Sequence, residues 1–204
     1  SLSAEYPVGT TTITWTVRDV NGNTNTTTQT IVVNDTELPV VKTQNIVIQL
    51  AANGQASITT TQINNGSTDN CAIATIALDK VNFNCSNVGE NTVVLTVTDI
   101  HGNSASANAI VTVQDNIAPT VITRPVTVTL VNGTATITAA QVNNGSFDNC
   151  GIASMTVSPA NFNCNNIGSN TVILTVTDVN GNTNSRTAIV SVVGQLPSCS
   201  ITSV

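Results

Sequence analysis

Apolar and polar residues alternate along three stretches of this chain, residues 12–35, 91–115 and 170–193. In the middle stretch, NTVVLTVTDIHGNSASANAIVTVQD, two β-branched runs flank a His-Gly pair, and the other two stretches carry Asn-Gly at that place. Strict alternation predicts half-buried strands, and a pair such as Asn-Gly between two such runs is typical of a hairpin with a two-residue turn. We therefore expect three copies of one β-hairpin.

The sequence behind the hairpin recurs as well. The Asp-Asn-Cys motif at positions 69–71 returns 79 residues later, at positions 148–150. The hairpin stretches recur with a period of 79 to 80 residues. So long a period with many short strands favours tandem β-sandwich domains over a solenoid, whose repeats are shorter. We predict an all-β chain of immunoglobulin-like sandwiches arranged as an elongated rod, with a small barrel as the alternative fold. The expected parts are the C-terminal part of an incomplete repeat (1–35), two complete repeats (36–115 and 116–195), and the start of a further module or a tail (196–204).

Each complete repeat should contain an edge strand and a longer second strand, at 56–63 and 135–142. A polar loop, a third strand (71–78 and 151–157) and a short fourth strand (81–85 and 161–164) should lead into the hairpin. The first repeat of the chain shows only its hairpin, so we expect a segment of a longer exported protein. We expect that hairpin to be ordered only if other residues or another chain supply the missing strands.

Charge and composition exclude several partners. Charged residues make up 8 % of the chain, aromatics 2 %, and the net charge is −6 with five scattered Lys and Arg residues. Without a basic patch, nucleic acid and anionic membranes are poor partners. We expect neither a membrane-spanning run nor membrane insertion. A Ser-His-Asp set and a Gly-rich phosphate loop are missing too, so an enzyme is the least expected class.

Paired cysteines without the spacing of a metal site predict disulfides, and disulfides imply an oxidising compartment. Cys150 and Cys164 repeat the sequence spacing of Cys71 and Cys85. The recurrence favours the disulfides Cys71–Cys85 and Cys150–Cys164 over free thiols, each worth about 3 kcal/mol. We expect the partner of Cys199 to lie outside the chain. No pair has the C-x2-C spacing of a zinc site, and with His101 as the single His we expect no His-based metal site and no role for His101.

Acidic residues gather at three kinds of place: after the first hairpin strand, in the linkers, and in the Asp-Asn-Cys loop. In an immunoglobulin-like topology these places share the end of a domain at which the linker enters. Ca²⁺ takes six to eight oxygens from carboxylates, Asn side chains and carbonyls. We therefore predict interdomain calcium sites at two junctions, with ligands drawn from Asp35, Glu37, Asp69, Asp99 and Asn103, and from Asp115, Asp148, Asp178 and Asn182. The alternative interpretation is ordinary turn chemistry, because Asp before Asn-Gly caps a turn without any metal.

The stretch YPVGTTTITWTVRDVNGN (6–23), followed by Val33-Asn34-Asp35, resembles the hyalin repeat, as do LTVTDIHGNS with VQDNIAP and LTVTDVNGNT. The resemblance covers nearly the whole chain outside 196–204. It implies an immunoglobulin-like extracellular adhesion module of the kind found in long bacterial surface proteins, with no catalytic residues. The linker QDNIAP (114–119) also resembles the calcium-binding linker of cadherins but lacks one of its acidic positions.

We therefore expect a structural stalk or adhesion repeat of a secreted or cell-surface protein that spaces or displays a distal binding tip. Its partners would be neighbouring repeats of the same polypeptide and an extracellular protein or glycan ligand. One alternative is a carbohydrate-binding module, for which only Phe147 offers an exposed loop aromatic. Another is a subunit of an extracellular polymeric fibre.

Overall fold

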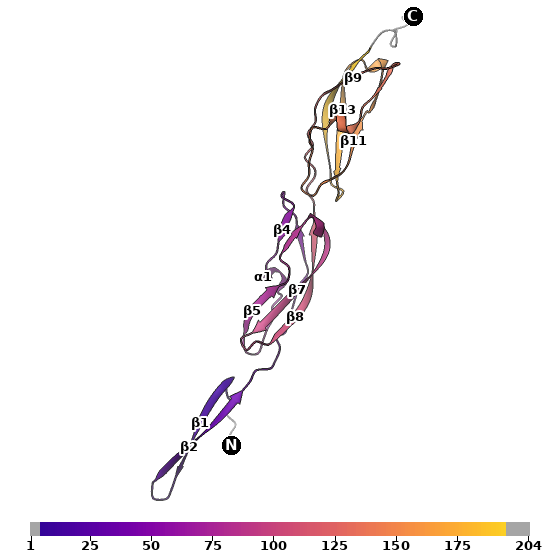
Figure 1. The fold of residues 1–204 in the computed structure, drawn as a ribbon. Coiled ribbons are helices and arrows are strands. Elements are labelled where there is room, and N and C mark those ends of the chain that lie inside the picture. The colour runs from indigo at the N-terminus through magenta and orange to yellow at the C-terminus, as the bar shows by residue number, and fades with distance from the viewer. Residues whose placement is uncertain (1–4, 195–204) are drawn as a thin grey trace, which may run out of the picture. The chain divides into compact units, whose positions relative to one another are not determined.

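The structure, a computed structural model, describes residues 5–194 (Figure 1). The chain divides into two compact units, residues 5–44, 59–80 and 93–109 in the first, and 45–58, 81–92 and 110–194 in the second. Strands β7 (Gly89–Asp99) and β8 (Ser104–Gln114) each run from one unit into the other. The unit border thus crosses the repeat at 36–115, and the domain borders drawn from the sequence period stay a prediction.

The first unit begins with a hairpin, in which β1 (Gly9–Arg18) pairs antiparallel with β2 (Thr24–Val33) over ten residue pairs. It also contains the single helical turn α1 (Thr60–Ile63) and strand β5 (Ile73–Leu78). Strand β5 pairs antiparallel with the end of β7, and an irregularity between Ile73 and Thr75 shifts the register by one residue.

The second unit contains the remaining strands of the first complete repeat. Strand β3 (Ile46–Gln49) runs parallel to the end of β8, and β4 (Gln55–Ser57) pairs antiparallel with β6 (Asn82–Asn84). A 3-10 turn, η1 (Cys85–Asn87), follows β6. The strand order of the larger sheet is β3-β8-β7-β5.

The second complete repeat has the same plan. Its elements are β9 (Val126–Thr129), β10 (Thr134–Thr136), α2 (Ala139–Val142), β11 (Ile152–Ser158), β12 (Asn161–Asn163), η2 (Cys164–Asn166), β13 (Gly168–Asp178) and β14 (Thr183–Val193). The larger sheet has the order β11-β13-β14-β9, with β9 parallel to β14, and the smaller sheet pairs β10 with β12.

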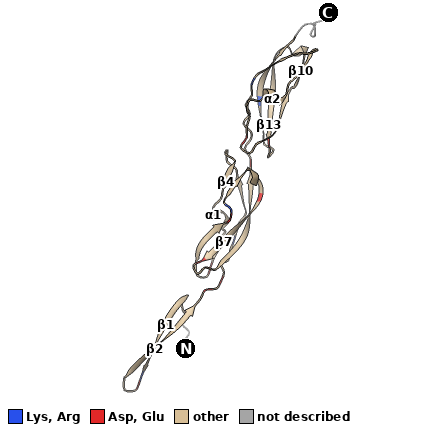
Figure 2. Ribbon diagram, viewed as in Figure 1, with Lys and Arg blue, Asp and Glu red and all other residues tan. Residues whose placement is uncertain are grey.

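Alternation along the hairpin strands builds the core. On β7 the side chains of Val93, Leu95 and Val97 are fully buried, while their neighbours face outward. Their counterparts on β13 are Val172, Leu174 and Val176. They belong to a buried cluster with Phe162 of the smaller sheet and with Leu130, which directly follows β9. Burying each such side chain stabilises the fold by about 1.5–3 kcal/mol. Few residues along the ribbon carry the colours of Lys, Arg, Asp or Glu (Figure 2). The all-β immunoglobulin-like sandwich predicted from the sequence is confirmed.

Two local predictions were wrong. The second strand does not extend over 56–63, because Thr59 and Gln62 form a capping interaction that starts α1, with the Thr59 N–H donating to Gln62 Oε1 at 2.8 Å. A Thr-x-x-Gln signature of this kind favours a helix start. The same pair, Thr138 and Gln141, ends the second strand of the next repeat early.

The hairpin turn is also longer than predicted. Four residues, 100–103, separate β7 from β8, and the Asp99 N–H donates to the Asn103 carbonyl at 3.0 Å. Of these loop residues only Gly102 has a positive φ, 92°, a conformation that glycine adopts without strain. The loops after β1 and β13 repeat this geometry at Gly22 and Gly181.

Candidate functional site

The Asp that ends each first hairpin strand organises the turn. Asp99 Oδ1 accepts hydrogen bonds from the backbone N–H groups of His101 and Asn103, both at 2.8 Å, and its Oδ2 accepts one from Asn103 Nδ2 at 2.7 Å. Asp19 and Asp178 accept the same three bonds in their own loops. The turn-chemistry interpretation therefore holds for all three hairpins.

The Asn that closes each loop also reaches back to the linker. Asn103 Nδ2 donates to the Asp35 carbonyl at 3.2 Å, and Asn182 Nδ2 donates to the Asp115 carbonyl at 3.0 Å. Both amides therefore present their nitrogen to the carboxylate and the linker. Asn103 and Asn182 thus position the Asp and the linker, and the metal-ligand role predicted for them from the sequence stays a prediction.

The acidic residues converge at both junctions. Carboxylate oxygens of Asp35, Asp69 and Asp99 lie within 4.8 Å of one another, and so do those of Asp115, Asp148 and Asp178. The sequence predicted this convergence from the topology. Glu37 is the exception: it is exposed and takes no part in either cluster, and its backbone N–H donates to Asp35 Oδ1 at 3.2 Å. Metal binding at the two clusters remains a prediction.

Three buried oxygens at the second junction lack a hydrogen-bond partner among the described residues: Asp115 Oδ2, Asp148 Oδ1 and Asn149 Oδ1. Asp115 is only 5 % exposed, and its other oxygen accepts from Ile117 N–H and from Asn149 Nδ2. Buried polar atoms are almost always partnered in folded proteins. A donor set of carboxylate and amide oxygens fits a hard cation such as Ca²⁺.

The disulfide pairing predicted from the sequence was wrong. Cys85 bonds Cys150, which lies 65 residues further along the chain, and Cys71 is a free, partly buried thiol. Cys164 is disulfide-bonded too, while Cys199 lies outside the described residues. The recurring spacing misled because the 3-10 turn after β6 directs Cys85 toward the next repeat. The bond therefore joins η1 of one repeat to the loop before β11 of the next.

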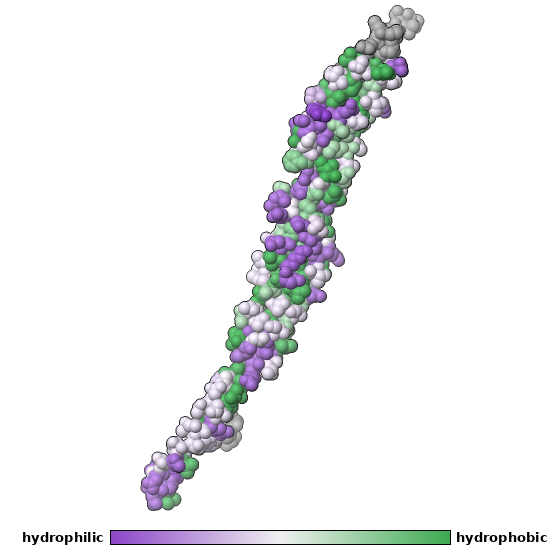
Figure 3. Space-filling view, viewed as in Figure 1, coloured by the Kyte–Doolittle hydropathy of each residue, from purple (hydrophilic) through white to green (hydrophobic). Residues whose placement is uncertain are grey.

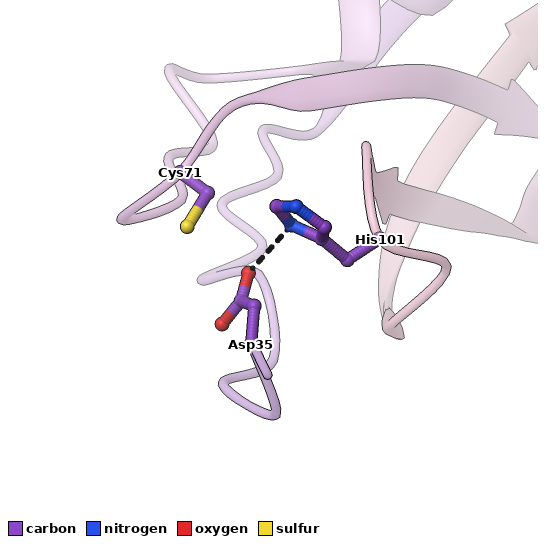
Figure 4. A group of neighbouring side chains, drawn as sticks. All are labelled: Asp35, Cys71 and His101. Carbon is purple, nitrogen blue, oxygen red and sulfur yellow. Dashed lines mark hydrogen bonds and ion pairs between the residues drawn. The ribbon is translucent and has the colours of Figure 1, made fainter. Parts of the chain in front are cut away.

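The first junction has a different composition. Figure 4 shows the Cys71 sulfur and the His101 ring both directed toward the Asp35 carboxylate, and His101 Nδ1 lies 3.1 Å from Asp35 Oδ2. The Cys71 thiol hydrogen-bonded to Asp35 is the main cause of a lowered pKa for that carboxyl. The same contact, together with burial, raises the pKa of Cys71 to about 11. Sequence reasoning gave His101 no role, and the structure places it against the linker Asp.

Burial works to raise the pKa of Asp99, but the hydrogen bonds from Asn103 and the His101 N–H outweigh it and leave the pKa lowered. Asp99 is therefore an anion at neutral pH although it is almost fully buried. A buried anion beside Asp35 raises the local density of negative charge, which favours a bound cation.

Hollows along the smaller sheets do not resemble sugar sites. One of about 380 Å³ is lined by β4 and β6, including Phe83, and one of about 320 Å³ by β10 and β12, including Phe162. Both Phe rings are buried and offer no face on which a sugar could stack. Phe147 is exposed as expected, but it does not line these hollows.

Among the described residues, no helix is long and apolar enough to cross a membrane. None of the protein-family models matches this sequence, and neither does any of the curated proteins.

Solved structures of protocadherins are similar to this chain. The EC1-3 segment of protocadherin gamma C5 matches with a TM-score of 0.39 and 11 % identity over 89 % of this chain and 77 % of that one. Extracellular cadherin domains 1-4 of protocadherin gamma B7 match with a TM-score of 0.39 and 11 % identity, over 86 % of this chain and 56 % of that one. Human protocadherin-24 EC1-2 matches with a TM-score of 0.39 and 14 % identity, over 77 % of this chain and 99 % of that one. At these identities and TM-scores the similarity concerns the fold alone and identifies no function.

Proposed function

We propose that this chain is a run of non-catalytic repeats of a secreted or cell-surface protein, related to hyalin repeats, that spaces or displays a distal binding tip. Its neighbouring repeats are its main partners, and an extracellular protein or glycan would bind at the tip. The observation that carries the proposal is the junction around Asp115, where a disulfide between repeats and a cluster of three carboxylates occur together. A covalent bond across the junction restrains one repeat against the next. Such a restraint suits a spacer that holds a binding tip at a distance.

Calcium completes this junction in our proposal. Two carboxylates about 4 Å apart repel each other by roughly 4 kcal/mol at an effective dielectric near 20. Ca²⁺ would relieve that repulsion and give the unpartnered oxygens of Asp115, Asp148 and Asn149 a ligand role. Asp178, held in its loop by three hydrogen bonds, supplies the third carboxylate.

The test compares melting of the chain in millimolar calcium and in chelator. A cation that binds only the folded state stabilises it by about 2.7 kcal/mol at a concentration 100 times Kd. We expect calcium to raise the melting temperature, and Asp115→Asn to abolish most of that rise. The control is Asp19→Asn, because Asp19 lies outside both clusters and its carboxylate accepts only hydrogen bonds of its own turn. Superimposable melting curves with and without calcium would contradict the calcium part of the proposal.

A second candidate function, subunit of an extracellular fibre, is favoured by the first hairpin. Trp15 and Val17 are 41 % and 69 % exposed, whereas Leu95 and Val97, at the same places in the next hairpin, are fully buried. The sheet of β1 and β2 has only these two strands among the described residues. Strands from another copy could cover this face.

A further inference from the structure

Three side chains of different chemistry meet at the first junction. Asp35 follows β2, Cys71 precedes β5, and His101 lies in the loop between β7 and β8. One potential ligand atom of each lies within 4.8 Å of the others, and His101 Nδ1 approaches Asp35 Oδ2 to 3.1 Å (Figure 4). Three segments distant in the sequence thus bring a thiol, an imidazole and a carboxylate to one point.

The second junction has the same backbone plan but lacks two of these groups. Cys150, the counterpart of Cys71, is consumed in the disulfide to Cys85. Asn180 stands where His101 stands, and the backbone N–H of each donates to the Asp of its turn at 2.8 Å. The His therefore adds an imidazole without altering the turn, and the missing disulfide leaves a thiol beside it.

We propose that Asp35, Cys71 and His101 form a Zn²⁺ site. Thiolate, imidazole and carboxylate are the protein ligands of zinc, bound about 2.0–2.3 Å from the ion in tetrahedral geometry. That geometry places neighbouring ligand atoms roughly 3.3–3.8 Å apart, so separations within 4.8 Å would have to shorten by at most about 1.5 Å.

A fourth ligand is at hand. Asp69 Oδ2 accepts the Cys71 N–H at 2.9 Å, while Asp69 Oδ1 is buried and has no hydrogen-bond partner in the described part of the chain. Asp69 also belongs to the carboxylate cluster with Asp35 and Asp99. Asp69 Oδ1 or a water molecule would complete four-coordination, and the dication would offset part of the negative charge of the three carboxylates and the Cys71 thiolate.

The two junctions would then prefer different metals. Ca²⁺ takes oxygen ligands, and the second cluster offers carboxylate and amide oxygens while its cysteine sulfur is oxidised. Zinc favours sulfur and nitrogen, which only the first cluster offers among the described residues. The zinc inference rests on the geometry at Asp35 and does not depend on the proposed function.

Cobalt(II) serves as a spectroscopic probe for the zinc site in the intact 204-residue chain, prepared without oxidation of Cys71. We expect one equivalent of Co²⁺ to give a sulfur-to-cobalt charge-transfer absorption that Zn²⁺ abolishes by displacement. Cys71→Ser should remove the absorption. His101→Asn should weaken binding at least tenfold, and it keeps the turn because Asn is the natural residue of the other two loops.

The matched control is Asn180→His, which puts an imidazole at the second junction, where the cysteine sulfur is already bonded. It should create no second charge-transfer absorption. Absence of the absorption in the unmodified chain, or unchanged Co²⁺ affinity in His101→Asn, would overturn the proposal. Both readouts are independent of the calcium-dependent melting of Asp115→Asn, so the zinc site and the calcium junction can fail separately.

Discussion

Gly54 lies so close to Asn149 that a Cβ atom at residue 54 would come within 2.9 Å of the Asn149 carbonyl oxygen. The same atom would lie 2.9 Å from Cys85 Sγ. Gly54 belongs to the turn before β4, and Asn149 precedes the cysteine to which Cys85 is bonded. The turn of one repeat thus contacts the loop of the next directly beside the disulfide.

We predict that Gly54→Ala destabilises the chain through this contact. An alanine at φ 71° lowers the free energy of unfolding by about 1–2 kcal/mol through backbone strain. The close contact of its Cβ lowers it by about 1–3 kcal/mol more, through overpacking. Gly66→Ala is the matched control, because Gly66 has φ 77° but no atom of the described residues lies within 4 Å of the place that its Cβ would take. Denaturant unfolding should show the larger loss for Gly54→Ala, and equal losses would show that the contact between repeats adds nothing.

The disulfide between repeats gives a second prediction. Closing a loop of 65 residues should stabilise by about 4 kcal/mol in the chain-entropy model. We expect Cys85→Ser to lower the stability of the second unit, and Cys71→Ser to leave that unit unchanged because its thiol is free. Peptide mapping without reduction should recover the Cys85 peptide linked to the Cys150 peptide. A Cys71–Cys85 link would restore the pairing predicted from the sequence.

The sequence was sufficient to predict the hairpins, the sandwich and the convergence of acidic residues. Strict alternation determines which side chains, such as Leu95 and Leu174, enter the core, and topology then brings the loops to one end. The Thr-x-x-Gln signature at Thr59 also indicates a helix start, but the alternating residues around it favour a strand over 56–63.

The cysteine pairing and the role of His101 could not be predicted in the same way. A spacing repeated in each domain is equally compatible with bonds inside a repeat and bonds from one repeat to the next. Only the direction of Cys85 after β6 decides between them. The contact between His101 and Asp35 joins residues 66 positions apart and leaves no periodic signal in the sequence.

Acid should destabilise the first junction. The pKa values of Asp35 and Asp99 are lowered from 3.8, mainly by the Cys71 thiol at Asp35 and, at Asp99, by hydrogen bonds that outweigh burial. A carboxyl group whose pKa is lower in the folded state stabilises that state at any pH above its pKa in the unfolded chain. This stabilisation is lost as the pH falls through the pKa of the folded state. In chelator, the free energy of unfolding should therefore decline as the pH falls below about 4.

Asp99→Asn should flatten part of this acid-dependent decline while lowering stability at neutral pH, because the amide presents a single acceptor oxygen. Carboxyl-carbon NMR titration gives the two pKa values directly. Values at or above 3.8 for both groups would contradict the hydrogen-bonding pattern around Asp35 and Asp99.

The last prediction concerns the first hairpin, whose surface Figure 3 colours mostly white, the intermediate hydropathy of its many threonines. Trp15 is the only tryptophan of the chain, so its emission reports on this hairpin alone. Its indole N–H donates to Gln29 Oε1 at 3.1 Å on the strand opposite, but no second sheet covers the ring among the described residues.

A two-stranded hairpin is marginally stable in water without a covered apolar face. We therefore expect solvent-exposed, readily quenched Trp15 emission and fast amide exchange over β1 and β2 in the monomeric chain, with slow exchange over β13 and β14. Trp15→Leu, which introduces the residue of the later hairpins, is the control for amide exchange. It should not slow exchange, because the two-stranded pairing and not the side chain limits protection. Raising the protein concentration should shift the emission to the blue if copies supply strands to one another. Amides of β1 that exchange as slowly as those of β13 in a proven monomer would show that the hairpin is stable alone, and would remove the observation that favours a fibre.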